Sequence, residues 1–212
     1  MEKVRIGVIG GGMGSYHLSY LKSIKGLELT AFCDIKPSVK DKISQQYQIA
    51  GFTDYQAMFA SGLIDAVLIA TPHYFHPEIS IQAFNQGIHV LCEKPIAVQV
   101  RDAEKINKTW EKSSVVFSVM FQERINPLYS KVKDLIQNGE LGEIIRFTWL
   151  ATHFFRTQAY YQSSDWRATW SGEGGGVLLN QAPHYLDLLQ WILGMPQTIY
   201  AHCYLGKYHQ IR

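Results

Sequence analysis

The feature that most constrains the fold is an alternation of short apolar runs with longer amphipathic segments. Continuous apolar runs are typical of strands whose two faces are both covered. They occupy residues 4–10, 27–34, 65–72, 88–95 and 115–121. Helical patterns lie between them, near residues 13–25, 38–47, 54–61, 76–86 and 99–112. This order predicts an α/β fold with a doubly wound parallel sheet.

The pattern changes after residue 121. Residues 126–143 have a helical pattern that ends in glycines. Residues 143–155 alternate and are rich in β-branched and aromatic side chains, which is typical of a longer strand. A helical pattern over residues 187–194 and a strand pattern over residues 198–206 follow. We therefore expect a second domain with a core of its own.

Composition excludes several classes of function. The formal net charge is +2 and the basic residues are scattered, so nothing indicates a nucleic-acid or membrane partner. The three cysteines are far apart and form no CxxC pair, so neither a zinc site nor a disulfide framework is indicated. The apolar part of the N-terminus is too short for a signal peptide, and no stretch approaches the roughly 18 apolar residues of a membrane span. We expect a cytoplasmic protein.

A glycine turn with Gly10 and Gly12 lies between the first strand pattern and the first helical pattern. Such a turn lets backbone N–H groups face a pyrophosphate, because side chains would block the approach. Ser15 stands where a third glycine is usual, and its small side chain is compatible with close packing. Asp34 ends the second strand pattern, where a carboxylate can accept both ribose hydroxyls of NAD and would repel a 2′-phosphate. The alternative is an ordinary glycine turn; we expect a dinucleotide site that favours NAD over NADP.

Two further stretches carry residues suited to chemistry. The sequence CEKP places Lys94 at the carboxyl edge of the sheet, where ligands bind in open α/β folds. The stretch 172–187, GEGGGVLLNQAPHYLD, places Asn180 and His184 four residues apart, which on one helix puts them on one face. Pro183 either kinks that helix or marks its start. Taken alone, Lys94 is more often a surface residue and His184 more often a structural one.

The chain resembles the Gfo/Idh/MocA family, the relatives of glucose-fructose oxidoreductase and inositol dehydrogenase. Four sequence elements in this order carry the resemblance: the glycine turn, the tripeptide Ala-Thr-Pro followed by His76, the tripeptide EKP, and the GGG run followed by His184. The resemblance covers the whole chain. It implies a Rossmann domain over residues 1–121. Residues 122–212 would begin an α+β substrate domain with an open, largely antiparallel sheet. It also implies an NAD-dependent oxidoreductase acting on a sugar, cyclitol or sugar derivative. For the full-length protein it implies a homo-oligomer, either dimer or tetramer.

The resemblance implies roles for individual residues. Catalysis is expected from His184, as the general base for the hydroxyl proton, and from Lys94, which hydrogen-bonds the same oxygen. Asn180 stands where many sugar and inositol dehydrogenases carry Asp, so His184 is expected to be less basic here. Cofactor contacts are expected from Gly10, Gly12, Met13, Asp34, Thr71, Pro72, His76, Glu93 and Lys94. Substrate contacts are expected from Lys94, Asn180 and His184. Independently of the resemblance, the residue types of Arg124, Trp166 and Arg167 make them further candidates for substrate contacts.

Several residues keep a second interpretation. Arg124 and Arg167 either bind substrate or form ion pairs, and Asp187 either orients the His184 ring or lies on a helix surface. Most aromatic residues between 149 and 170 are expected in a core, with Trp166 as the sugar contact. The histidines at 73 and 76 lack a third ligand at a helpful spacing, so no metal site is expected.

The chain is shorter than the family it resembles, so we expect a fragment or a truncated product that binds NAD and turns over poorly. Two other functions stay open. A non-catalytic NAD-binding regulator would be expected to have lost Lys94 or His184, and both are present. An enzyme that cycles tightly held NADP between two sugars would be expected to carry Ser or Arg near position 34, and often an export signal.

Overall fold

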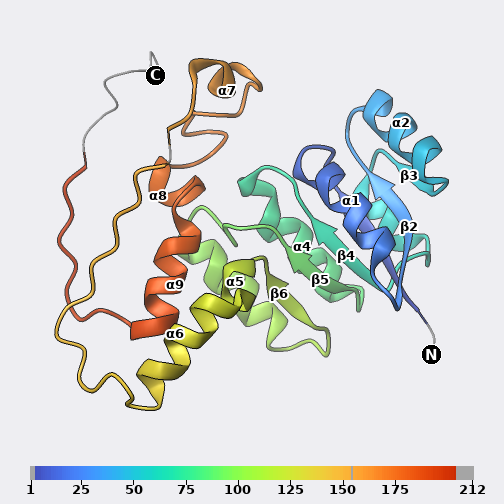
Figure 1. Ribbon diagram of the computed structural model, residues 1–212. Coiled ribbons are helices and arrows are strands. Elements are labelled where there is room, and N and C mark those ends of the chain that lie inside the picture. Colours follow the sequence, from blue (N-terminus) through green and yellow to red (C-terminus); the bar gives the residue numbers. More distant parts are fainter. Residues whose placement is uncertain (1–2, 154, 204–212) are drawn as a thin grey trace. The chain divides into compact units, whose positions relative to one another are not determined.

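The computed structural model describes residues 3–153 and 155–203, and the chain forms two compact units, Met1–Met120 and Phe121–Arg212. The first unit contains a six-stranded sheet in the order β3-β2-β1-β4-β5-β6, with every neighbouring pair parallel (Figure 1). The strands are β1 (Val4–Ile9), β2 (Leu27–Cys33), β3 (Ala50–Phe52), β4 (Ala66–Ile69), β5 (His89–Cys92) and β6 (Phe117–Val119). The predicted parallel sheet is confirmed. Only β3 was not anticipated, because three residues are too few to show a periodic pattern.

Helices connect these strands in the expected alternation. They are α1 (Met13–Ser23), α2 (Pro37–Tyr47), α3 (Tyr55–Ala60), η1 (His73–Phe75), α4 (His76–Asn85) and α5 (Val100–Trp110). Local sequence explains two of the starts. Pro37 lies in the first turn of α2, where its missing N–H costs no hydrogen bond. Asp54 caps α3 by accepting the backbone N–H of Gln56 at 2.9 Å.

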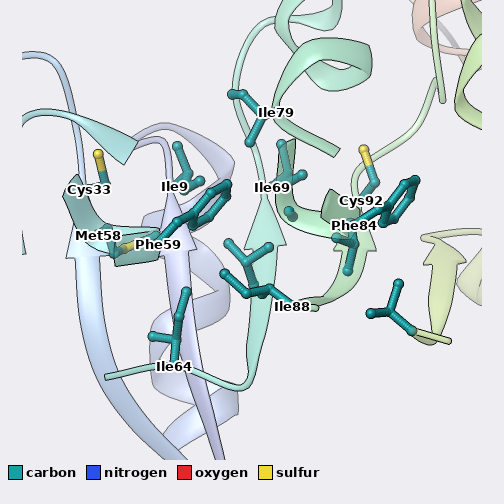
Figure 2. Packing of buried hydrophobic residues seen from close by; sticks show 14 of the residues in the cluster. Ile9, Cys33, Met58, Phe59, Ile64, Ile69, Ile79, Phe84, Ile88 and Cys92 are labelled. Carbon is teal, nitrogen blue, oxygen red and sulfur yellow. The ribbon is translucent and has the colours of Figure 1, made fainter. Parts of the chain in front are cut away.

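Two hydrophobic clusters cover the two faces of the sheet. One packs α3 and α4 against the strands through residues such as Met58 and Phe84 (Figure 2), and α5 joins it through Ile106. The other packs α1 and α2 through Leu18 and Ile43. Burial on both faces explains why the strands read as continuous apolar runs.

The strand order places a switch point between β1 and β4. After β1 the chain builds outward to β2 and β3, and it then returns to place β4 on the other side of β1. In open sheets of this order, ligands bind at the carboxyl ends of the strands beside that switch. This edge of the sheet is therefore where a ligand site is expected.

The second unit is helical in its described part. Its elements are η2 (Gln122–Ile125), α6 (Pro127–Gln137), α7 (Gln158–Gln162), α8 (Val177–Asn180) and α9 (Pro183–Leu193). Helices α6 and α9 pack side by side (Figure 1). Asn126 caps α6 by accepting the N–H of Leu128 at 3.0 Å, and Gly194, with φ 86°, ends α9. None of the described helices in either unit is both long and apolar enough to cross a membrane.

The two strands expected in the second unit are not formed in its described part. Residues 143–153, residue 155 and residues 198–203 contain neither helix nor strand, and residues 154 and 204–206 lie outside the described residues. Their β-branched and aromatic composition expresses a preference for extended backbone. A strand also needs neighbouring strands to hydrogen-bond with, and none is present in the described part of this unit. The expected open antiparallel sheet is therefore absent from these residues.

Candidate active site

The carboxyl edge of the sheet brings together residues that are far apart in the sequence. Gly10 follows β1, Asp34 follows β2, Thr71 lies just beyond β4, and the EKP sequence follows β5. Backbone hydrogen bonds extend the sheet to this edge. Gly10 N–H donates to the Cys33 carbonyl at 2.9 Å, and Glu93 N–H donates to the Ile69 carbonyl at 2.9 Å. These bonds join the segments that follow β1 and β5 to the ends of the neighbouring strands β2 and β4.

The glycine turn needs its glycines for two different reasons. Gly10 has φ 102°, and a Cβ there would stand 2.5 Å from the Ala70 carbonyl oxygen. A Cβ at Gly12 would meet nothing within 4 Å. Gly10 therefore allows the turn to pack on β4, whereas Gly12 leaves the backbone before α1 open to a ligand.

Close packing of α1 on β1 depends on Gly14, not on the residue in the usual third glycine position. A Cβ at Gly14 would stand 2.9 Å from Val8 Cγ1. Ser15 instead donates its hydroxyl to the Gly11 carbonyl at 2.5 Å. The glycine that packs against β1 thus lies one residue earlier than the third glycine of the usual dinucleotide-binding motif. Met13, the first residue of the helix, is exposed.

Asp34 is half-buried and faces the glycine turn. Its Oδ2 accepts the Gly11 N–H at 2.6 Å, and its Oδ1 accepts the Lys36 N–H at 2.8 Å. A Cβ at Gly11 would stand 2.7 Å from Asp34 Oδ2, so this contact also requires a glycine. The carboxylate is therefore held in a fixed orientation at the end of β2.

His76 does not occupy the position that the sequence suggested. Its side chain is 0% exposed, so its ring has no surface with which to contact a cofactor. Its Nδ1 lies 2.8 Å from the Pro95 carbonyl and its Nε2 lies 2.8 Å from the Thr71 carbonyl. Burial lowers the pKa of His76, while the two carbonyl contacts act in the opposite direction. The ring therefore joins the Thr71 carbonyl, beyond the end of β4, to the Pro95 carbonyl, beyond the end of β5.

The EKP sequence is anchored to α1 by a histidine that the sequence analysis did not identify. His17 Nε2 lies 2.7 Å from Glu93 Oε1, and both side chains are largely buried. The Lys94 N–H donates to Glu93 Oε2 at 3.2 Å. Burial raises the pKa of Glu93, but the hydrogen bond and charge of His17, with the N–H and charge of Lys94, bring it below its usual value. Lys94 itself is half-buried and is joined to Pro95 by a cis peptide bond.

These features fit a bound dinucleotide. The open backbone at Gly12 leaves room for a pyrophosphate beside the N-terminus of α1. Asp34 offers a carboxylate at the end of β2, where a ribose would lie. The Thr71 hydroxyl is buried and has no hydrogen-bond partner within the described part of the chain. Buried polar groups are normally satisfied, so this hydroxyl is suited to a ligand contact.

In the second unit, Arg124 and Asp187 form an ion pair. Arg124 Nε and Nη2 lie 2.7 and 2.5 Å from the two Asp187 oxygens. The Asp187 side chain is 8% exposed and that of Arg124 is 40% exposed. The hydrogen bond from Arg124 to Asp187 raises the pKa of Arg124. Arg124 therefore forms an ion pair, one of the two interpretations given for it above. Asp187 faces Arg124, and the pair connects η2 to α9.

Asn180 and His184 do not share a helix. Asn180 is the last residue of α8, and Pro183 begins α9, so His184 lies in the first turn of the next helix. The expected common face fails because Pro183 lacks the N–H that would continue α8. The His184 ring meets the Phe121 ring edge-on, with centroids 6.1 Å apart. Asn180 is buried and donates its amide N–H to Glu173 Oε1.

Arg167 and Trp166 form a stacked group with Tyr160. The Arg167 guanidinium lies 4.3 Å from the Tyr160 ring centroid and 4.8 Å from that of Trp166. Arg167 Nη1 also donates to the Tyr160 hydroxyl at 2.5 Å. One face of the Trp166 ring is thus occupied by a cation. The expected sugar contact would have to use the rest of its half-buried surface.

Two functional candidates were missed by reading the sequence. His17 lies one turn into α1, and its partner Glu93 is 76 residues away. Glu173 is buried directly before the glycine run, where an acid in front of GGG was the only available signal. Within residues 3–153 and 155–203, no three or more His, Cys, Asp or Glu side chains are arranged to hold a metal ion.

Comparison with known proteins matches both parts of the chain to one family. The model described as an oxidoreductase family with an NAD-binding Rossmann fold matches residues 4–121. The model described as the GFO/IDH/MocA C-terminal domain matches residues 129–209. Together these two matches account for most of the sequence.

Individual relatives agree with this assignment. The D-glucoside 3-dehydrogenase of Escherichia coli is 30% identical over 206 residues, which cover 95% of this chain and 58% of the relative. The solved WlbA dehydrogenase of Bordetella pertussis, in complex with NADH and UDP-GlcNAcA, has a TM-score of 0.81 and 31% identity, covering 91% of this chain and 60% of that one. The myo-inositol 2-dehydrogenase of Lactobacillus plantarum has a TM-score of 0.77 and 26% identity, covering 91% and 57%. The chain thus spans less than two thirds of the length of these relatives.

Proposed function

The chain belongs to the Gfo/Idh/MocA oxidoreductase family, and from this premise we propose that the protein carries out NAD-dependent hydride transfer at a carbinol carbon. The observation that carries the proposal is the carboxyl edge of the sheet. There the open glycine turn, Asp34 and the anchored Glu93–Lys94 pair follow three different strands. The substrate is a sugar, a cyclitol or a sugar derivative, the class named for the D-glucoside 3-dehydrogenase, for an inositol 2-dehydrogenase and in the WlbA complex with UDP-GlcNAcA.

NAD, when bound, supplies the hydride acceptor or donor through its nicotinamide. The residues of the chain bind and orient the substrate and move one proton. His184 accepts the proton of the reacting hydroxyl, a role worth about 10²- to 10⁴-fold. Lys94 donates a hydrogen bond to the same oxygen and favours its alkoxide character. Asn180 orients a substrate hydroxyl without adding a negative charge.

Turnover measurements test this proposal. Nicotinamide absorbance would be followed with NAD⁺ across polyols, aldoses, inositols and nucleotide sugars such as UDP-GlcNAcA. We expect reduction with one class, and a loss of kcat/KM of about 10²-fold or more in Lys94→Ala and in His184→Ala. Lys105→Ala, on the exposed face of α5, is the matched control and should leave kcat/KM unchanged.

Two results would count against parts of the proposal. Unchanged turnover in His184→Ala would remove its role as base. Saturable NAD⁺ binding without turnover of any substrate in the panel would favour the non-catalytic NAD-binding regulator, or a chain that lacks a part needed for catalysis. Repeating the assay on a chain extended beyond residue 212 separates these two outcomes.

The proposal extends to the organisation of the protein. Residues 1–121 bind the dinucleotide, and residues 122–212 contribute Asn180, His184 and the Arg167 group to substrate binding. We propose a cytoplasmic homo-oligomer without a nucleic-acid or membrane partner. The three free cysteines support a reducing compartment, and the net charge of +2 with scattered basic residues supports the absence of a nucleic-acid or membrane partner. The homo-oligomer is proposed from the resemblance to the family alone. Light scattering on the purified chain tests the oligomer.

A further inference from the structure

A buried carboxylate that the proposed mechanism does not use lies directly before the glycine run. Glu173 is 3% exposed, and both of its oxygens accept hydrogen bonds. Oε1 accepts from the side-chain amide of Asn180, and Oε2 accepts the Ala168 N–H at 2.9 Å. Arg167 Nη1 lies 3.7 Å from Oε1. The acid is therefore enclosed by donors.

The geometry decides the orientation of the Asn180 amide. An ionised carboxylate can only accept hydrogen bonds, so the group that Asn180 turns toward Glu173 must be its NH₂ and not its carbonyl. Amide groups are otherwise ambiguous, because their oxygen and nitrogen have nearly the same shape. Glu173 thus fixes the orientation of the Asn180 amide: the NH₂ group faces Glu173, and Oδ1 is the atom left for other contacts.

Glu173 is itself held in place by a compact turn. Its N–H donates to the Thr169 carbonyl at 2.9 Å, and the Gly172 N–H donates to Thr169 Oγ1 at 3.0 Å. A Cβ at Gly172 would overlap the Trp166 carbonyl oxygen, so only glycine fits. Ala168 adopts φ 56°, a left-handed conformation that its N–H bond to Glu173 supports. The carboxylate cannot easily move away from position 180.

We propose that Glu173 is a positioning residue that determines which side chain can serve at position 180. With a buried acceptor fixed at Glu173, position 180 must supply a donor, which Asn does and Asp does not. An Asp there would place two carboxylates in contact away from water, at a high cost. The contact with Glu173 thus accounts for Asn at position 180 of this chain. As far as it concerns catalysis, this inference rests on the proposed function.

Exchanging the carboxylate at position 173 with the amide at position 180 tests the inference. In Glu173→Gln, the oxygen is needed by the Ala168 N–H, so the new NH₂ meets the Asn180 NH₂ unless the Asn180 amide turns over and loses its present orientation. In Asn180→Asp, two carboxylates meet. The double variant restores the two hydrogen bonds, though not the ion pair with Arg167, because the new amide at position 173 accepts from Ala168 through its oxygen and donates its NH₂ to the new carboxylate at position 180. We expect each single change to lower Tm by roughly 3 to 10 °C, and the double variant to recover more than half of the larger loss.

The thermal measurement stands whatever the reaction is. If the singles fail to fold while the double folds, the inference is supported. It is overturned if the losses simply add, if Asn180→Asp is as stable as the wild type, or if the double does not fold. Absence of turnover in the wild type would contradict the proposed function alone and would leave this measurement intact.

The pH profile separates a positioning role from a purely structural one. The double variant places a negative charge at position 180, four residues before His184. A neighbouring negative charge favours the protonated ring, so the midpoint of kcat/KM against pH should move upward by about one unit. Recovered stability with an unmoved midpoint would overturn the link between Glu173 and catalysis.

Discussion

Gly10 meets two requirements that no other residue type satisfies together. It has φ 102°, and a Cβ there would lie 2.5 Å from the Ala70 carbonyl oxygen. Gly26 is a matched control, because it has φ 92° but nothing within 4 Å of a Cβ. The comparison separates the strain of the backbone conformation from the clash with β4.

We expect Gly26→Ala to lower the free energy of unfolding by about 1–2 kcal/mol through strain alone. Gly10→Ala should cost at least about 2 kcal/mol more, because the clash is with a backbone atom that cannot move aside. Urea denaturation of both variants measures the difference. Equal losses would show that the turn does not pack on β4 as described.

Ala168 leads to a prediction of opposite sign. Its φ of 56° is unfavourable for a residue with a Cβ, so Ala168→Gly should raise the free energy of unfolding by about 0.5–1 kcal/mol. The control is Ala57→Gly on the exposed face of α3, which should lower it by about 1 kcal/mol. Denaturant midpoints for the two variants should move in opposite directions; movement in the same direction would contradict the turn geometry.

Among the elements, the Glu93–His17 pair joins the end of β5 to α1. The pKa of Glu93 is lower in the folded protein than its usual value of 4.5. The carboxylate therefore contributes stability that is present above about pH 4.5 and is lost as the pH falls through the folded-state pKa. Glu93→Gln removes that ionisation but keeps the shape of the side chain.

We expect the difference in unfolding free energy between wild type and Glu93→Gln to be largest above pH 4.5 and to shrink below it. Denaturation at a series of pH values from neutral to acid measures this. Glu104→Gln, an exposed acid of α5 whose ion-pair partner Lys108 is 3.9 Å away, is the control and should show little dependence. A gap that stays constant with pH would contradict the pairing.

The Arg124–Asp187 pair joins η2 to α9, the helix that carries His184. The Asp187 side chain is nearly enclosed, whereas that of Arg124 remains 40% exposed. Substitutions at the two positions should therefore lower the free energy of unfolding by different amounts. Arg124→Ala leaves a buried charge unpaired and should cost about 3 kcal/mol, whereas Asp187→Asn leaves a cation that water can reach and should cost about 1 kcal/mol. Denaturation curves test the order; a larger loss in Asp187→Asn would show that the pair is not buried as described.

At the scale of the whole molecule, most of the first unit could be predicted from the sequence. Five of its six strands left an apolar run that the sequence analysis used, and glycine, acid and lysine marked one edge of the sheet. Individual side-chain contacts left no such mark. His17 meets Glu93 from 76 residues away, and the contact of Glu173 with Asn180 depends on how the turn between them closes.

The second unit was less readable for a related reason. Residues 143–155 have the composition of a strand, but composition cannot supply the neighbouring strand. Asn180 and His184 have helical spacing, yet Pro183 ends one helix and begins another between them. The guanidinium of Arg124 is a group that could bind a substrate, and only the structure shows that it is paired with Asp187.

The measurement that tests the central claim most directly is calorimetric titration of the chain with NAD⁺ and with NADP⁺. We expect saturable binding of NAD⁺ at least about tenfold tighter than of NADP⁺, because Asp34 repels a 2′-phosphate. Asp34→Asn should narrow that ratio, while Asp41→Asn, an exposed acid of α2, should not. Equal affinity for the two cofactors would contradict the role of Asp34, and no saturable binding of either would contradict the dinucleotide site itself.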